Sequence, residues 1–218
     1  MMAMIPLKLG MVVTLMVLLV AIPAVAQTTV DVDSPSNTPS EGNITVPIAV
    51  SDINNFDAGQ FDILFDSSKA ALLTIGNGTI NGTAIPVALY AEIEPGRWRV
   101  ILNVPGFPGV SGNGTLANLE FQSVSLAPGD TLAVSVENEF LNDNEAQEIP
   151  AEWAGGETLV YLRGDASGDG RINTSDITKI ERIILMMDAE TIGADINLDT
   201  HVNTSDVTLC ERIILGYD

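Results

Sequence analysis

The chain has 218 residues, and its 29 acidic side chains against 9 basic ones give a formal net charge of −20. A field of this sign repels nucleic acid and anionic membranes and attracts cations, which excludes nucleic-acid binding through net charge. The hydrophobic content of 46% is too high for a chain that is disordered throughout. Length and composition therefore favour one ordinary domain plus a smaller one, with an acidic, solvated surface.

The N-terminal residues 1–26 are typical of an export signal. Lys8 supplies a positive charge, an apolar run follows at 11–23, and small residues at 24–26 offer a cleavage site before Gln27. The run is short for a membrane span, and an uncleaved anchor is the alternative. We therefore expect a signal peptide, a secreted or cell-surface protein, and no membrane span after cleavage.

Segments between residues 27 and 162 alternate apolar and polar side chains with the period of a β-strand. Turn-forming Gly, Pro and Asn residues separate them about every ten residues, and no long helical period occurs before residue 160. The pattern predicts an antiparallel β-sandwich, with a closed barrel as the alternative. The expected strands lie at 43–51, 59–66, 97–104, 114–124, 130–137 and 157–163.

The predicted sandwich holds no catalytic constellation. It contains neither His nor Cys, which excludes Ser-His-Asp and Cys-His chemistry within it. Carboxylates are numerous, but the sequence shows no two of them at the separation that glycoside cleavage requires. Trp98 and Trp153 could stack on sugar rings, although packing against the core is the expected role. We therefore expect no enzyme activity.

Two stretches of the predicted sandwich resemble cohesin modules. "NITVPIAVSDINNFDAGQFDILFDSSKAALLTI" is similar to the opening strands of that family, and "GNGTLANLEFQSV" resembles its later G-x-[LF]-A-x-[IL]-x-F strand. The resemblance covers about residues 28 to 162 and implies a jelly-roll-type sandwich that is non-catalytic and binds a partner module, dockerin, on a sheet face. Related carbohydrate-binding sandwiches share parts of these motifs, so a polysaccharide-binding module is the alternative.

An acidic motif occurs twice near the end of the chain, as "GDASGDGRINTSD" at 164–176 and "ADINLDTHVNTSD" at 194–206. Oxygen donors fall at positions 1, 3, 5, 9 and 12 of each loop, which is the ligand spacing of a twelve-residue calcium loop. Position 7 contributes only its backbone carbonyl, so Arg171 and His201 can occupy it. The sequence therefore predicts two Ca²⁺ ions. The expected ligands are Asp165, Ser167, Asp169, Arg171, Asn173 and Asp176 in the first loop, and Asp195, Asn197, Asp199, His201, Asn203 and Asp206 in the second.

The two loops depart from the EF-hand pattern in instructive ways. Position 12 is Asp in both, where the EF-hand has Glu. Position 6 is Gly170 in the first loop and Thr200 in the second, and a β-branched residue is unfavourable at a sharp turn. Ser167, at position 3, is a weaker ligand than Asp or Asn. We therefore expect the second site to be weaker or differently bent. Two matches in register argue against a plain acidic linker.

Apolar residues at helical spacing follow each loop and predict one helix per repeat. Cys210 stands where the first repeat has Ile180, so a small core residue is expected there rather than a reactive thiol. No full helix precedes the first loop, since a strand runs directly into it. The apolar positions are Ile177, Ile180, Ile183, Ile184 and Met187 in the first repeat, and Val207, Cys210, Ile213 and Ile214 in the second.

A calcium loop followed by one helix, repeated with Asp at position 12, resembles the dockerin pattern over about residues 164 to 218. The resemblance implies recognition of a cohesin by the helix starts, and near-identical repeats imply docking in two orientations. Helix capping and a solvated helix face are the alternative roles for the same residues. The implied contact residues are Thr174, Ser175, Glu181 and Arg182 in the first repeat, and Thr204, Ser205, Glu211 and Arg212 in the second.

Three regions are therefore expected: a signal peptide at 1–26, a cohesin-like β-sandwich at 27–162, and a small α module of dockerin type at 163–218. Such a chain would be a secreted, non-catalytic assembly protein. It would bind a cohesin-bearing protein through its C-terminal module in a calcium-dependent way, and a dockerin-bearing protein through its sandwich. Only Arg163 and Gly164 separate the two modules, which disfavours docking within one chain.

Overall fold

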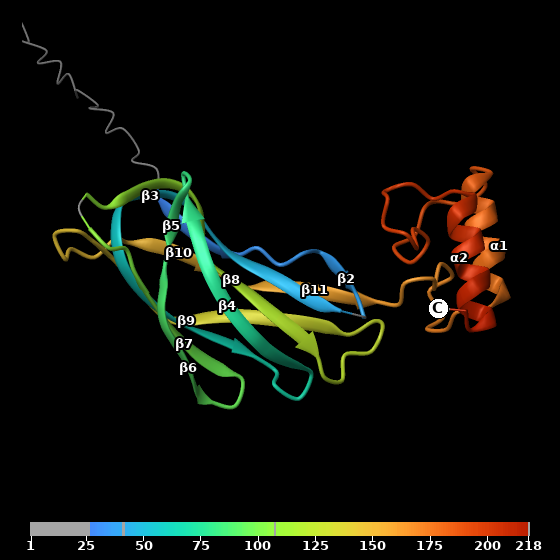
Figure 1. Cartoon of the computed structure of the whole chain (residues 1–218), viewed down its shortest axis with the longest axis horizontal. Coiled ribbons are helices and arrows are strands. Elements are labelled where there is room, and N and C mark those ends of the chain that lie inside the picture. Colours follow the sequence, from blue (N-terminus) through green and yellow to red (C-terminus); the bar gives the residue numbers. More distant parts are fainter. Residues whose placement is uncertain (1–26, 41, 107, 218) are drawn as a thin grey trace, which may run out of the picture.

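The computed structural model describes residues 27–40, 42–106 and 108–217, so the predicted signal peptide lies outside the described residues. A curled β-sandwich is followed by two helices that lie beyond one end of it (Figure 1). None of the helices in the described part of the chain is long and apolar enough to cross a membrane. The elements are β1 (Thr28–Val32), β2 (Asn37–Pro39), β3 (Asn43–Phe65), β4 (Ala70–Ile80), β5 (Thr83–Ile85), β6 (Val87–Glu94), β7 (Arg97–Asn103), β8 (Val110–Ser123), β9 (Thr131–Asp143), β10 (Ala151–Ala154), β11 (Gly156–Tyr161), α1 (Thr174–Ile184) and α2 (Thr204–Leu215).

The strands form one continuous hydrogen-bonded sheet that curls into two layers. Its main path runs β2-β11-β9-β3-β8-β4-β5, while β1, β10, β6 and β7 are attached beside it. Most neighbours are antiparallel, as predicted, but β1 pairs in parallel with β10 and β2 with β11. The sandwich and the small helical module are thus confirmed, with two parallel pairings added to the expected antiparallel ones.

Strand β3 joins the two layers. The alternating pattern predicts separate strands at 43–51 and 59–66, but the chain stays extended between them and bends instead. Asp52 and Asn55 adopt left-handed backbone angles (φ 54° and 57°) where the register with β8 shifts, as at β-bulges. The first half of β3 pairs with β1 and β8, and the second half pairs with β7 and β9.

Alternating side chains of both layers build the core. Phe56, Phe61 and Phe121 are fully buried at its centre. Trp153 packs on Phe61 with ring centroids 5.7 Å apart, and Trp98 lies 6.1 Å from the Tyr90 ring. Trp153 thus takes the core-packing role that the sequence favoured, whereas Trp98 is half-buried beside Tyr90.

The two helices share a second, smaller core around Ile180 and Cys210, which are both fully buried. Burial is the main cause that raises the pKa of the Cys210 thiol to about 11, so the thiol stays protonated and packs as a small apolar group. The prediction that Met187 lies on the buried stripe is wrong. Helix α1 ends at Ile184, the chain turns at Met186, and Met187 is exposed.

The two repeats carry different residues at the left-handed position that follows each helix. Gly216 follows α2 at φ 71°, whereas the equivalent residue of the first repeat, Met186, holds φ 57° with a side chain. A left-handed angle is costly for a residue with a Cβ, so Met186→Gly should raise the free energy of unfolding of the helical module by about 1 kcal/mol. Urea titration followed by circular dichroism measures it. Met187→Gly is the matched control and should not stabilise; an equal effect of both changes would contradict the account.

Candidate functional site

The first acidic loop bends around the carboxylate of Asp165. One oxygen of this carboxylate accepts the backbone N–H groups of Gly168 (2.7 Å) and Asp169 (3.0 Å), and the other accepts that of Gly170 (2.7 Å). Gly170 holds φ 82°, which a glycine adopts readily. The turn predicted at position 6 is therefore present, and the first carboxylate organises it.

The second loop follows the same plan. Asp195 accepts the backbone N–H groups of Asp199 (3.2 Å) and Thr200 (2.8 Å). Thr200 takes the left-handed angle of the first loop's glycine, φ 70°, despite its β-branched side chain. Both loops are thus bent alike, so the different bend expected from Thr200 is not found, and a weaker second site stays a prediction.

A buried carboxylate at position 12 ties each loop to the helix that follows. Asp176 is fully buried and accepts the backbone N–H groups of Asn173 (2.8 Å) and Ser167 (2.9 Å). Asp206 is also fully buried and accepts the backbone N–H groups of Asn203 (2.9 Å), Asn197 (3.3 Å) and Ile196 (2.8 Å). Each forms a capping box with the Asn at position 9, whose side chain caps the helix start. The spacing between loop and helix is therefore fixed by one side chain.

The remaining oxygen donors lie beside one another. The Asn173 amide nitrogen lies 3.4 Å from an Asp169 oxygen, and the Asn203 amide donates to the backbone carbonyl of His201 at 3.2 Å. The side chains of Arg171 and His201 are exposed, which leaves only their carbonyls for the loop interior. The oxygen donors gather in two groups, Asp165, Ser167, Asp169, Asn173 and Asp176, and Asp195, Asn197, Asp199, Asn203 and Asp206.

The chemistry of these donors fits a hard divalent cation. Every side-chain donor is an oxygen, and each loop supplies three carboxylates, the ligand type that Ca²⁺ prefers. Within the described residues, no group of three or more His, Cys, Asp or Glu side chains is placed as a metal site. In both loops the carboxylates at positions 1 and 12 accept backbone N–H groups.

The residues implied as partner contacts lie on exposed faces of the two helices. Thr178, four residues beyond Thr174, and Leu185, which follows the last residue of α1, are exposed as well. Leu185 is exposed, as is Leu215 at the same place in α2. The residues that the resemblance implies as contacts are all exposed: Thr174, Ser175, Glu181 and Arg182 in the first repeat, and Thr204, Ser205, Glu211 and Arg212 in the second.

Two arginines that are equivalent in sequence have different partners. Arg182 forms a two-pronged ion pair with Asp188, with N–O distances of 3.0 and 2.9 Å, and Lys179 adds a third bond of 3.0 Å. The hydrogen bond from Arg182, followed by that from Lys179, holds the pKa of Asp188 well below its usual range. In the second repeat, Arg212 donates to the backbone carbonyl of Tyr217 at 3.2 Å.

The sandwich presents one sheet face with exposed apolar side chains, formed by β6, β7, the second half of β3, and β9. Leu89, Ile101, Gln60 and Phe140 are direct cross-strand partners and form one row across these four strands. Leu89 is 59% exposed and Phe140 is 45% exposed. We call the outer surface of these strands the receptor face.

The buried carboxylate of Asp62 organises the row next to it on the receptor face. It accepts hydrogen bonds from both Arg97 (3.1 and 2.9 Å) and Arg99 (2.7 and 3.0 Å), and from the Asn138 amide (2.7 Å). Its pKa lies at about 2, below the ordinary 3.8. The Arg99 hydrogen bond is the largest cause; burial comes next and acts the other way, and the hydrogen bonds of Asn138 and Arg97 lower the pKa further.

The charge left accessible on the receptor face is acidic. Lys69, Arg97 and Arg99 are the only basic residues in the sequence from 27 to 162, and Asp62 engages the last two. Glu94 and Glu137 each lie 3.3 Å from Arg97, and their side chains remain 61% and 55% exposed. The receptor face is therefore an apolar row bordered by solvent-facing carboxylates.

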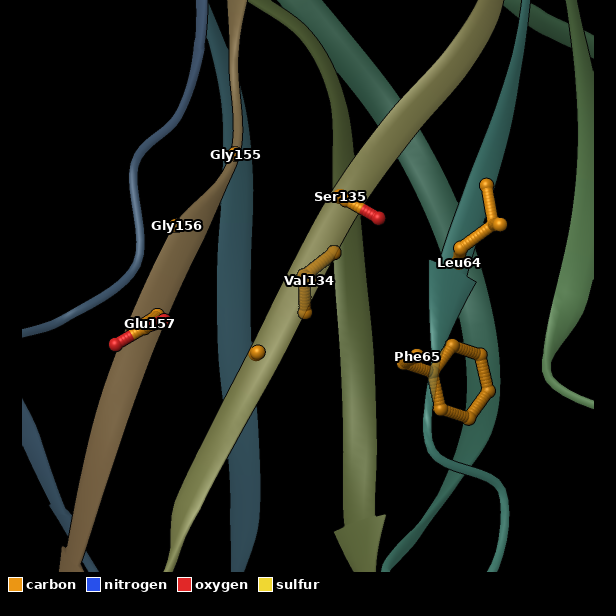
Figure 2. A pocket seen from close by; sticks show the side chains of 8 residues that line it. Leu64, Phe65, Val134, Ser135, Gly155, Gly156 and Glu157 are labelled. Carbon is orange, nitrogen blue, oxygen red and sulfur yellow. The ribbon is translucent and has the colours of Figure 1, made fainter.

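A separate hollow lies over β9, between the end of β3 and the start of β11 (Figure 2). Its lining includes Leu64, Phe65 and Val134, together with the backbone of Gly155 and Gly156. Among the lining residues there is one carboxylate and one hydroxyl, from Glu157 and Ser135. The lining thus offers no pair of carboxylates for glycoside cleavage and no set of metal donors.

The fold and the site define a class: a modular protein with a β-sandwich interaction module and a loop–helix repeat module. The family model described as Cohesin domain matches residues 28–160, and the one described as Dockerin type I domain matches residues 163–215. The chain belongs to the cohesin family and carries a type I dockerin domain after its cohesin domain. A search of curated proteins found no match.

Solved cohesins share the fold of the sandwich. A non-cellulosomal cohesin from the archaeon Archaeoglobus fulgidus is 16% identical, with TM-score 0.50, covering 62% of this chain and 91% of its own. The sixth cohesin of Acetivibrio cellulolyticus scaffoldin B, solved with a dockerin, is 20% identical, with TM-score 0.52 and coverages of 63% and 100%. A type I cohesin from Pseudobacteroides cellulosolvens is 18% identical, with TM-score 0.53 and coverages of 62% and 93%. At these identities the likeness establishes the fold alone.

Cohesin and dockerin domains are non-catalytic interaction modules, and no catalytic family matches this chain. Together they imply protein–protein assembly in complexes of cellulosome type, whose components are typically extracellular. Type I dockerin domains bind calcium.

The depressed pKa of Asp62 makes the sandwich sensitive to acid. Its contribution is fully present above the unfolded-state pKa near 3.8 and is lost as the pH falls through about 2. Relative to Asp62→Asn, the wild-type chain should therefore lose roughly 2 kcal/mol of unfolding free energy between these pH values. Denaturant titrations of both proteins at several pH values, followed by tryptophan fluorescence, test this. Parallel pH profiles for the two proteins would contradict it.

Proposed function

We propose that this chain is a secreted, non-catalytic adaptor of an extracellular complex. Its residues 163–218 bind two calcium ions and dock on a cohesin-bearing protein, and its residues 27–162 receive a dockerin-bearing protein. One observation carries the proposal: both halves of a cohesin–dockerin pair occur in one chain, and each presents an exposed face. Residues 1–26 are the proposed signal peptide, supported by their sequence pattern.

Each loop would hold one ion through the oxygen donors gathered in it. The ligands proposed for the first loop are Asp165, Ser167, Asp169, Asn173 and Asp176, with the carbonyl of Arg171, and the equivalent residues serve the second. A bound ion would supply two positive charges against three carboxylates that repel one another. The helical module has a small core and Cys210 is the sole cysteine of the chain, so no disulfide braces it. The folded module therefore depends on the ion.

Docking on the receptor face is supported by a comparison of the side chains exposed on the outer surfaces of the two layers. The outer side of the first half of β3 and of β8 carries polar residues: Thr45 is in register with Glu120, and Asn118 lies two residues before Glu120 on β8. The receptor face instead exposes Leu89 and Phe140. An exposed apolar row with a polar border is the usual anatomy of a protein interface.

Removing calcium should unfold the C-terminal module. We expect EGTA to abolish most of the helical circular dichroism signal of the full chain, and added calcium to restore it. Asp169→Ala should weaken calcium binding at least about tenfold in calorimetry. Arg171→Ala is the matched control, since only the backbone carbonyl of Arg171 is a proposed ligand. The calcium affinity of this variant should equal that of the wild type. A helical signal that is insensitive to EGTA would overturn the calcium proposal.

Charging the apolar row should abolish capture of a dockerin by the sandwich. A panel of dockerins from the same genome is first screened for the one that the sandwich binds most tightly. The double change Leu89→Asp with Phe140→Asp should lower the affinity of the sandwich for that dockerin at least about tenfold. Leu73→Asp is the matched control, because Leu73 is as exposed as Phe140 (46% against 45%) but lies on β4 in the other layer. Affinity electrophoresis against polysaccharides runs in parallel. Retention by a polysaccharide, with no dockerin bound, would replace the receptor role with carbohydrate binding.

A further inference from the structure

We propose that the sandwich carries N-linked oligosaccharides on Asn77 and Asn113. The acceptor motif for this modification is Asn-x-Ser/Thr, which is typical of surface segments in exported proteins. The proposal goes beyond the assembly role and rests on one part of it, the export of the chain. The motif occurs six times, at Asn43, Asn77, Asn81 and Asn113 in the sandwich and at Asn173 and Asn203 in the helical module.

The modification acts on one atom, the amide nitrogen Nδ2 of the asparagine. This nitrogen attacks the anomeric carbon of a lipid-linked oligosaccharide, so that a C–N bond forms and the C–O bond to the lipid phosphate breaks. The lipid phosphate is released together with one of the two amide protons. The side-chain oxygen and the second proton keep their places. A suitable site is therefore an exposed asparagine whose Nδ2 has no acceptor on the protein.

Asn77 and Asn113 meet this condition. The side-chain oxygen of Asn77 accepts the backbone N–H of Val87 at 2.9 Å, and that of Asn113 accepts the backbone N–H of Asp52 at 2.7 Å. Both residues are exposed, and neither amide nitrogen donates to an acceptor within residues 27–40, 42–106 and 108–217. Each side chain is thus held in place through its oxygen, while the nitrogen that would carry the sugar is unengaged.

Asn81 has the same Asn-Gly-Thr tripeptide but a different environment. Its Nδ2 donates to the backbone carbonyl of Ser111 at 2.9 Å, and a Cβ at Gly112 would lie only 2.0 Å from this nitrogen. The nitrogen is therefore packed against the backbone of β8, where an attached sugar has no room. The tripeptide alone does not separate Asn81 from Asn77 and Asn113, whereas the fold does.

The amide nitrogens of the other three sequon asparagines are engaged as well. Asn43 donates to the Glu120 carboxylate at 2.6 Å, which is a charge-assisted hydrogen bond. Asn173 and Asn203 are half-buried helix caps and proposed calcium ligands, and their nitrogens face acceptors in their own loops at 3.4 and 3.2 Å. The helical module is therefore left without sugars.

The two assigned sites share one layer of the sandwich. Asn77 lies on β4 and Asn113 lies on β8, and these strands pair with each other and do not contribute to the receptor face (Figure 1). The oligosaccharides would therefore be attached to the layer that the docking proposal does not use.

Glycopeptide mass spectrometry of the chain secreted by its natural producing cells tests the assignment. We expect an oligosaccharide on Asn77 and on Asn113, and none on the other four sequon asparagines. Asn81 is the internal control, because its tripeptide is identical. A missing oligosaccharide at either assigned site, or an oligosaccharide on any other sequon, would overturn the assignment.

Variants made in the same cells separate a lost sugar from a folding defect. Asn77→Gln should remove the mass of one oligosaccharide from the intact secreted chain, and Asn81→Gln should remove none. Thr79→Ala keeps Asn77 and its bond to Val87 but destroys the sequon, so it should cause the same loss, whereas Thr79→Ser keeps the sequon and the sugar. If Thr79→Ala retains the full attached mass, the proposal fails.

N-terminal sequencing of the same chain tests the proposed export separately. A secreted chain that begins at Gln27 but carries no oligosaccharide leaves the export standing and contradicts only this proposal. A chain found only inside the cells contradicts the export and, with it, the modification.

Discussion

The buried aspartate at position 12 of each loop is the constraint on which the helical module depends. Asp176 accepts backbone N–H groups from both its loop and its helix start, and Asp206 does the same. Fully buried carboxylates of this kind hold loop and helix in one geometry, and their charge favours a cation beside them. The loop geometry sets the position of each exposed helix face. Metal binding by the loop and docking through the helix therefore depend on the same aspartate.

The sandwich uses a carboxylate in a comparable way. Asp62 is buried and accepts hydrogen bonds from two arginines in the row next to the exposed apolar one. The acidic excess of the chain therefore has local roles: it is turned inward in the loops and under the arginines, and outward at the border of the receptor face. A net charge of −20 describes none of these placements.

Much of the fold could be predicted from the sequence, because apolar residues repeat every 2 positions in a half-buried strand and every 3.6 positions in a half-buried helix. The loops, both helices and most strands follow from such patterns. The continuity of β3 was not predictable, since its polar residues around Asp52 and Asn55 read as a loop but form bulges. The exposure of Met187 and the pairing of Arg182 with Asp188 depend on where α1 ends, and the receptor face depends on pairings between distant strands.

The central claim is that one chain bridges two partners through two independent faces. A surface-binding assay tests it most directly: a cohesin that the chain binds is immobilised, the chain is captured on it in calcium, and a dockerin recognised by the sandwich is then passed over. The account predicts that the dockerin binds only after the chain, with one dockerin per captured chain, and that EGTA releases both. Capture of the chain without any subsequent dockerin binding, or capture that persists in EGTA, would contradict it.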